Sequence, residues 1–322
     1  MSIEEILASW KNKLIIIKEQ QDNSGNIIQK GLRTPQWGAY YEIMSHWSLS
    51  KEHAIIVMPT GTGKTDTMIT VVVGNLCERV LIIVPSVALR DQIGKKFEQL
   101  GILKTFGLLP DNALPPDVGY LKKAFKTLAE IDEFFLKKNV IVSTASVFSN
   151  LKQGHLERIS SLCSHLFMDE AHHAQAPKTW EKIQTAFAKK CALLFTATPY
   201  RNDQKLLLGK NIYTYPLKKA QEEKYFTQIE KVPISEWDDE YADIAIAEKA
   251  VEVLRQDLEK YPAHLLMARV NNIARAKDIF SIYEKYSEFN PVLIHSEISK
   301  KERKDLLERF TLGKSKLGPS LD

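Results

Sequence analysis

Short apolar runs alternate with longer amphipathic stretches through most of the chain. Near-continuous apolar runs are typical of parallel strands that are covered by helices on both faces. Their alternation with helical stretches predicts a doubly wound α/β domain. The expected strands are Ala54–Val57, Val80–Val84, Val140–Ser143, His165–Met168 and Ala192–Phe195.

The pattern changes on both sides of this region. Residues 4–20 have a helical pattern and lead into a turn at residues 22–26, while the proline-rich segment 108–116 is expected to be a surface loop. A new pattern starts after residues 214–223. It predicts helices around Tyr241–Glu259, Asn272–Tyr286 and Ser299–Phe310, and strands at His264–Ala268 and Pro291–His295.

Length and composition agree with more than one domain. A chain of 322 residues is long for a single ordinary domain, and 44% hydrophobic residues supply a sizeable core. We expect an N-terminal helical extension over residues 1–29, a first domain over residues 30–218 and a partial second domain over residues 219–322.

Charge and cysteine content narrow the class of protein. The net charge of +4 is small against 44 basic and 40 acidic residues, so a nucleic acid would be bound by a local groove rather than by general attraction. Cys77, Cys163 and Cys191 lie far apart, which favours reduced core residues over a disulfide framework or a zinc site. The apolar run Leu14–Ile17 is too short for a membrane span, so a cytoplasmic protein without membrane association is expected.

The segment Met58–Thr65, M-P-T-G-T-G-K-T, stands between an expected strand and an expected buried helix. This context is typical of a phosphate-binding loop, whereas a glycine-rich turn that binds nothing would not require the Lys-Thr pair. The glycines let backbone N–H groups face phosphate oxygens, Lys64 reaches the outer phosphates, and the Thr65 hydroxyl can ligate Mg²⁺. The predicted nucleotide-binding residues of the loop are Thr60, Gly61, Thr62, Gly63, Lys64 and Thr65.

A second motif, Asp169-Glu170-Ala171-His172, follows the expected strand His165–Met168. Carboxylates at the carboxyl end of a parallel strand lie where open α/β sheets bind ligands. There Asp169 can hold Mg²⁺ at the phosphates, and Glu170 can orient or deprotonate the attacking water. An ordinary acidic strand end explains this motif equally well in isolation, but much less well beside a phosphate loop.

A third motif, F-T-A-T-P, ends the expected strand Ala192–Phe195. Hydroxyl groups at Thr196 and Thr198 can form hydrogen bonds with the acidic motif. Taken alone, such a segment is better interpreted as a strand followed by a turn.

The three motifs in this order resemble the helicases and translocases of superfamily 2, the DEAD/DEAH class. The resemblance covers roughly residues 30–310 and implies a RecA-like parallel sheet with helices on both faces, a partial second RecA-like lobe, and ATP and Mg²⁺ as cofactors. The motif variants are most similar to the branch of type III restriction subunits and repair-type translocases. In RNA-specific DEAD-box proteins the acidic motif ends in Asp rather than in His172, which favours DNA over RNA as the partner.

The resemblance also implies roles for further residues. Gln36, in the segment L-R-T-P-Q, would read the adenine edge, and residues 84–92, 142–145 and 264–270 resemble motifs that line the nucleic-acid groove. The implied nucleic-acid contacts are Pro85, Arg90, Gln92, Thr144 and Arg269. The implied catalytic residues are Lys64, Asp169, Glu170 and His172, and Thr196 and Thr198 would couple them to nucleic acid.

The 322 residues contain no Gly-Arg dipeptide, and therefore no match to the family motif that carries the arginine finger. Such a finger is worth about 10³–10⁵ in rate in related NTPases, so slow turnover is expected for the chain alone. A truncated ATP-dependent DNA helicase or translocase is the preferred interpretation. A motor whose finger comes from a partner subunit, and a non-catalytic nucleotide-gated DNA-binding module, stay open.

Overall fold

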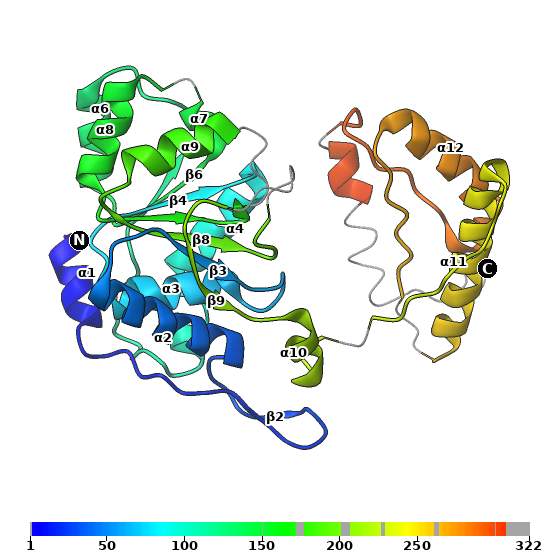
Figure 1. The fold of residues 1–322 in the computed structure, drawn as a ribbon, viewed down its shortest axis with the longest axis horizontal. Helices are drawn as coiled ribbons and strands as arrows, with labels where there is room; N and C mark the ends of the chain where they lie inside the picture. Colours follow the sequence, from blue (N-terminus) through cyan, green and yellow to red (C-terminus); the bar gives the residue numbers. More distant parts are fainter. Residues whose placement is uncertain are drawn as a thin grey trace. The chain divides into compact units, whose positions relative to one another are not determined.

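The computed structural model describes residues 2–149, 151–171, 177–200, 207–226, 229–260, 264–299 and 301–306. The chain divides into two compact units, Met1–Gln228 and Ile229–Asp322 (Figure 1).

The first unit is built on a parallel sheet of seven strands in the order β5-β6-β4-β7-β8-β3-β9. All five predicted strands are confirmed, and two further strands, β5 and β9, occupy the edges of the sheet. The edge strands contain Gly, Tyr, Lys and Asn and are only partly buried, so they lack the apolar run that indicates the inner strands. The strands are β3 (Ala54–Val57), β4 (Val80–Val84), β5 (Val118–Leu121), β6 (Val140–Thr144), β7 (His165–Met168), β8 (Cys191–Thr196) and β9 (Lys210–Thr214).

Helices cover both faces of this sheet, which confirms the predicted doubly wound architecture (Figure 1). Because side chains alternate along a strand, Ile56 and Ile82 pack in one apolar layer, whereas Ile55 and Ile83 pack in the other. The first layer is closed by α1 (Ile3–Trp10), α2 (Thr34–Leu49), α3 (Lys64–Gly74), α4 (Val87–Glu98) and α5 (Ile102–Thr105). The second is closed by α6 (Leu128–Leu136), α7 (Ala145–Phe148), α8 (Gln153–Leu162) and α9 (Pro177–Ala186).

The N-terminal helix is shorter than the predicted span of residues 4–20. Ser2 caps α1 by accepting a hydrogen bond from the Glu5 N–H, and the helix ends at Trp10. Beyond it the backbone bonds to distant segments, with the Ile15 N–H donating to the Leu108 carbonyl at 2.9 Å. These long-range bonds replace helical ones, so the prediction was wrong after Trp10. The predicted turn lies in a hairpin of β1 (Gln20–Gln21) and β2 (Ile27–Gln29).

The segment 108–116 is a loop, as predicted, and Pro110, Asp111 and Asn112 are exposed, but its apolar side chains do not lie on the surface. Leu108, Leu109 and Ala113 are all at most 2% exposed and belong to the core. The indole N–H of Trp10 donates to the Leu114 carbonyl at 2.8 Å. The prolines shape an irregular segment, but its apolar side chains pack under α1.

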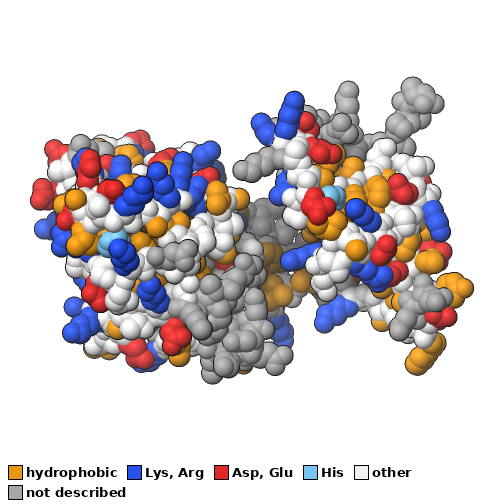
Figure 2. Space-filling model, turned by 90° about the horizontal axis from the view of Figure 1, so that it is seen from above, with side chains coloured by type: hydrophobic (Ala, Val, Ile, Leu, Met, Phe, Trp, Pro, Cys, Tyr) orange, Lys and Arg blue, Asp and Glu red, His pale blue; other side chains and the backbone are white. Residues whose placement is uncertain are grey.

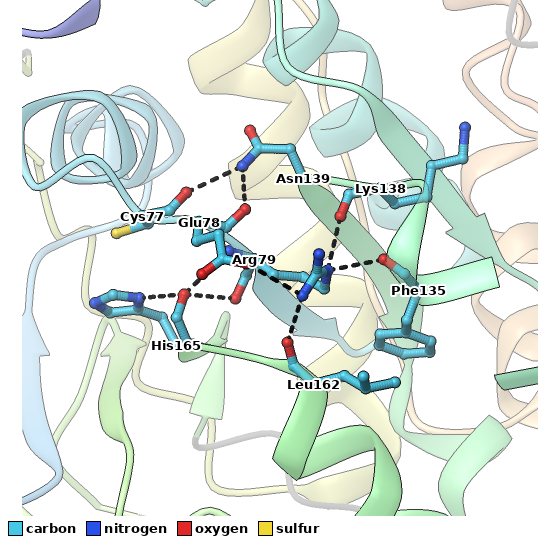
Figure 3. Close-up of polar contacts among 9 residues, drawn as sticks. Cys77, Glu78, Arg79, Phe135, Lys138, Asn139, Leu162 and His165 are labelled. Atoms are coloured by element: carbon cyan, nitrogen blue, oxygen red, sulfur yellow. Dashed lines mark hydrogen bonds and ion pairs between the residues drawn. The ribbon is translucent and has the colours of Figure 1, made fainter. Parts of the chain in front are cut away.

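A buried arginine joins three elements at the amino edge of the sheet (Figure 3). Arg79 Nε donates to the carbonyl oxygens of Phe135 (2.8 Å) and Lys138 (3.1 Å), and its Nη1 donates to that of Leu162 at 2.7 Å. Asn139 lies beside it and donates to backbone carbonyls that precede β4. The ends of α6 and α8 are thereby satisfied by side chains rather than by water.

The segment after β9 packs on the first unit. It contains α10 (Leu217–Glu222), whose Ala220 is fully buried, and Lys224, whose Nζ donates to the Asn23 carbonyl at 2.6 Å. The compact unit therefore extends past residue 218, where the sequence pattern placed the boundary.

The second unit contains α11 (Asp239–Lys260), α12 (Ile273–Tyr283), a short 3₁₀ helix (Ser287–Phe289) and a helical segment at 301–306. The first two predicted helices are confirmed, and part of the third lies outside the described residues. The predicted strands His264–Ala268 and Pro291–His295 are not formed, because neither pairs with another strand among the described residues. No helix in the described part of the chain is long and apolar enough to cross a membrane.

Candidate functional site

The three sequence motifs meet at the carboxyl edge of the sheet. The phosphate loop follows β3, the acidic motif follows β7, and the T-A-T-P segment follows β8, which lies between these two strands. The Met58 N–H donates to the Thr196 carbonyl, and the Asp169 N–H donates to the Ile83 carbonyl, both at 2.8 Å. Segments more than 100 residues apart in sequence therefore share one site.

The loop before α3 has the backbone that a phosphate cradle requires. Gly61 (φ 89°) and Gly63 (φ 95°) both occupy the left-handed region, which other residues rarely adopt. Thr62 is fully buried, and its Oγ1 donates to the Pro59 carbonyl at 2.6 Å. Lys64 then begins α3, so the helix N-terminus faces the loop.

Lys64 forms an ion pair with the acidic motif. Its Nζ lies 2.8 Å from Glu170 Oε1, and only 7% and 14% of the two side chains are exposed. Glu170 has a φ of 48°, which is uncommon for a residue other than glycine. The lysine predicted to reach the phosphates and the carboxylate predicted to orient water are therefore in direct contact.

Asp169 is the carboxylate best suited to a cation. Burial raises its pKa to about 6, although the nearby Lys64 charge opposes this shift. Its Oδ1 is buried and accepts no hydrogen bond. Such an orphaned acceptor fits Mg²⁺, and Thr65 is half-buried in the first turn of α3. No three His, Cys, Asp or Glu side chains cluster in the described residues.

Gln36 lies beside the phosphate loop. Its Oε1 accepts a hydrogen bond from the Arg33 N–H at 2.8 Å, and its Nε2 lies 3.4 Å from the Gly63 carbonyl. A Cβ at residue 63 would stand 2.1 Å from that Nε2, so only glycine permits the approach. Gln36 thus caps α2 and borders the nucleotide loop at the same time.

The nucleic-acid candidates of the first unit follow β4 and β6, which are neighbours in the sheet. Pro85 is half-buried and Gln92 is exposed, but the buried Arg90 guanidinium is paired with Asp91 at 2.8 Å. The Thr144 hydroxyl shares a hydrogen bond with that of Ser146. Arg269 is exposed and belongs to the second unit.

Of the remaining predicted residues, the structure describes Thr196 and Thr198 but not His172. Thr196 is buried, and its Oγ1 donates to the Thr198 carbonyl at 2.6 Å and accepts from the Thr198 N–H. The two threonines therefore close the turn after β8 themselves. His172 lies outside the described residues.

Basic side chains gather on the face of the first unit that carries α6 and α8 (Figure 2). An open hollow there is lined by Lys122, Lys123, Lys126, Lys137 and Lys138 together with aromatic rings. The last two lysines are paired with acidic side chains, at 3.2 and 2.7 Å. The first two follow β5 directly, at the same edge of the sheet as the other motifs.

Sequence reasoning missed three side chains that adjoin the loop. Arg33 Nη1 donates to the Gly61 carbonyl at 3.2 Å, and its guanidinium lies 5.3 Å from the centre of the Tyr225 ring. Phe226 packs near Gly61. No local signal could reveal these contacts, because Tyr225 lies 191 residues after its hydrogen-bond partner Thr34.

The fold and the site define a RecA-like domain with a phosphate-binding loop. Residues 29–201 match the family described as "Type III restriction enzyme, res subunit", and the chain belongs to this family. It is accordingly a superfamily 2 helicase-like protein, and at family level this class consists of nucleic-acid-dependent ATPases. No curated protein sequence matches the chain.

Two solved helicase structures, with TM-scores of 0.53 and 0.52, share the fold, and this chain spans only part of the length of each. The DEAD-box helicase Mss116 bound to ssRNA and UDP-BeF matches at 18% identity with a TM-score of 0.53, over 88% of this chain and 59% of that chain. The Mycobacterium smegmatis helicase Lhr bound to ssDNA and AMP-PNP matches at 18% identity with a TM-score of 0.52, over 87% of this chain and 38% of that chain. The type ISP restriction-modification enzyme LlaGI, as a nuclease-deletion mutant with a DNA substrate mimic, matches at 16% identity and a TM-score of 0.41, over 91% of this chain and 30% of that chain.

Proposed function

We propose that the chain is the motor part of an ATP-dependent DNA helicase or translocase, in which ATP hydrolysis is coupled to nucleic-acid binding. The observation that carries this proposal is the meeting of Lys64, Asp169 and Thr196 at the carboxyl ends of three adjacent strands, β3, β7 and β8. Family membership supports the motor class. The buried, unpaired cysteines Cys77 and Cys163 support a reducing, cytoplasmic location.

Each residue of the proposed site would have a separate role at the ATP phosphates. Lys64 and the loop N–H groups would bind the β- and γ-phosphates, while Thr65 and Asp169 would hold Mg²⁺, which supplies charge neutralisation there. Lys64 must exchange Glu170 for phosphate as ATP enters. The released Glu170 carboxylate would then orient the attacking water.

Binding of Mg–ATP tests the phosphate site. Lys64→Ala removes the ammonium group that reaches the phosphates, and the affinity measured by calorimetry should fall by about 100-fold. Lys51→Ala, which removes an exposed lysine just before β3, is the matched control and should bind as the parent does. Unchanged affinity of the Lys64 variant would refute the assignment.

The choice of ATP over GTP tests Gln36. Adenine donates from N6 and accepts at N7, which suits the amide of Gln36, and the amide oxygen has a second lone pair beside the bond to Arg33. Gln36→Glu keeps the acceptor that caps α2 but loses the donor. Its ATP/GTP affinity ratio should drop toward one, and an unaltered ratio would exclude adenine reading.

DNA binding is tested by fluorescence anisotropy with duplex DNA, single-stranded DNA and RNA of one sequence. Gln92 and Thr144 lie at the proposed edge, and Arg90 would have to release Asp91 to join them. DNA should bind more tightly than RNA, with a steep decrease in affinity as salt rises. Tighter binding of RNA would overturn the proposed substrate.

Turnover tests the origin of the arginine finger. The sequence has no Gly-Arg dipeptide, so we propose that a partner subunit supplies the finger. The 322-residue chain should hydrolyse ATP slowly even with saturating DNA. Fast turnover would show that one of its own arginines, such as Arg269 or Arg303, serves as the finger.

A further inference from the structure

Two aromatic residues after α10 lie against the phosphate loop. Tyr225 and Phe226 are both half-buried, so each ring has packed and accessible parts. They are the last described residues of the first unit before residue 229. Neither belongs to a motif of the sequence analysis.

Tyr225 is fixed to the start of α2. Its hydroxyl oxygen accepts a hydrogen bond from the Thr34 N–H at 3.1 Å and lies 3.4 Å from Thr34 Oγ1. The guanidinium of Arg33 packs 5.3 Å from the centre of its ring while donating to the Gly61 carbonyl. The tyrosine is therefore joined to both the helix that carries Gln36 and the loop.

Phe226 lies directly on the loop. Two of its ring carbons are 3.1 and 3.2 Å from the place where a Cβ of Gly61 would stand. Gly61 also needs its left-handed backbone, with a φ of 89°. The missing side chain at residue 61 thus leaves the room that the phenyl ring occupies.

We infer that Tyr225 and Phe226 form an aromatic wall that stacks on the purine base of the nucleotide, with Phe226 in contact with the base and Tyr225 positioning it. This inference rests on the proposed nucleotide site. A base read by Gln36 must lie beside the loop, and Arg33, Tyr225 and Phe226 border that place. Aromatic rings hold bases through their faces without regard to base identity.

Two ligands separate the base from the phosphates: Mg–ATP, and Mg–tripolyphosphate, which has no base. Phe226→Ala should weaken ATP binding about tenfold and leave tripolyphosphate binding unchanged. Phe226→Leu keeps an apolar side chain on Gly61 but lacks a flat face, and it should lose a similar factor. Tyr41→Ala, which removes a ring exposed on α2, is the control and should bind both ligands normally.

The base specificity and the position of the base give two further readouts. Loss of the Phe226 ring should weaken ATP and GTP equally, because stacking does not discriminate between purines, whereas the Gln36 variant changes their ratio. A 2-aminopurine nucleoside triphosphate, whose fluorescence is quenched by stacking, should be quenched by the parent and not by saturated Phe226→Leu. Tyr225→Phe, which loses only the bond to Thr34, should quench it partly.

The outcomes are separable. If the parent binds both ligands and the Phe226 variants bind ATP as tightly as the parent, the aromatic wall is wrong and the phosphate site stands. If the variants lose tripolyphosphate as well, Phe226 only shapes the loop, and the inference is overturned. If the parent binds neither ligand, the proposed nucleotide site fails and the inference fails with it.

Discussion

At the scale of residues, a glutamate side chain neutralises the lysine of the proposed phosphate site. Lys64 Nζ and Glu170 Oε1 are 2.8 Å apart in a largely buried position, and Asp169 beside them is driven toward its neutral form by burial. A buried lysine without an anion would be costly, so Glu170 stabilises Lys64. Under the proposed function, phosphate would replace Glu170, and nucleotide binding would compete with this ion pair.

This competition makes Glu170→Gln informative. The amide keeps the shape of the side chain but removes the charge that holds Lys64, so Mg–ATP should bind about fivefold more tightly at low salt. Calorimetry at two salt concentrations measures this gain. Turnover should fall at the same time, because glutamine cannot orient or deprotonate water as a carboxylate does. Weaker ATP binding by this variant would contradict the competition.

At the scale of elements, the carboxyl and amino edges of the sheet differ in what they carry. The carboxyl edge carries the loops of the site, whereas the amino edge is fixed by Arg79, which donates to the ends of α6 and α8. Arg79 is 6% exposed, so its hydrogen bonds lie almost entirely out of contact with water. The rigid edge supports the strands from which the functional loops project.

Arg79→Met should therefore destabilise the first unit without changing the site. Three carbonyl oxygens would lose their donor in a buried place, which costs about 3 kcal/mol of the free energy of unfolding. Chemical denaturation measures this loss. Arg158→Met, at a half-exposed pair with Asp132, is the matched control and should cost no more than about 1 kcal/mol. If the two variants lost the same free energy of unfolding, the hydrogen bonds of Arg79 would stabilise the unit no more than an exposed ion pair does.

A histidine of β7 makes stability depend on pH. Burial lowers the pKa of His165 to about 4, and the ring lies between Trp47, whose ring centre is 5.0 Å away, and Asn75, whose amide is 3.1 Å from Nε2. The unfolded chain protonates this histidine near pH 6.5, whereas the folded chain does not. The contribution of neutral His165 to the free energy of unfolding is thus complete above pH 6.5. It is lost as the pH falls toward 4.

The loss should amount to about 3 kcal/mol of the free energy of unfolding across that interval. Denaturation curves between pH 4 and pH 7 measure it. His165→Gln should flatten the dependence on pH even if it lowers the stability at pH 7. An unchanged slope in the His165 variant would disprove the assignment.

At the scale of the whole molecule, the two units differ in how completely they bury their apolar residues. The first unit has two closed apolar layers on its sheet. In the second unit Leu265 is 64% and Met267 is 81% exposed, and Val292 and Ile294 are more than a third exposed. The first unit therefore has the core of an independent domain.

The first unit should accordingly fold alone. Residues 1–228 expressed by themselves should unfold in one cooperative transition and bind Mg–ATP within about twofold of the full chain, since the proposed contacts all lie within them. Circular dichroism and calorimetry measure both properties. Residues 229–322 alone should unfold without a sharp transition. A first unit that fails to fold, or that loses ATP, would show that the second unit is needed.

The sequence by itself determined the inner strands and the order of the motifs. Both signals are local: a buried strand needs a continuous apolar run, and a phosphate loop needs Gly63, Lys64 and Thr65 side by side. The structure confirmed the five inner strands and brought the motifs to one edge. The roles proposed for individual site residues stay predictions.

Only the tertiary structure decided the rest, because the deciding contacts are distant in sequence. The edge strands β5 and β9 are partly buried, so their pattern is weak, and pairing with β6 and β3 makes them strands. In the loop at 108–116, Leu108, Leu109 and Ala113 are buried because they pack in the core beside α1. Tyr225 bonds to Thr34 across 191 residues, and Phe226 reaches Gly61 from the same distant part of the chain. The apolar segments of the second unit are not strands because no described strand pairs with them. Burial and hydrogen bonding depend on neighbours in space, which a local pattern does not contain.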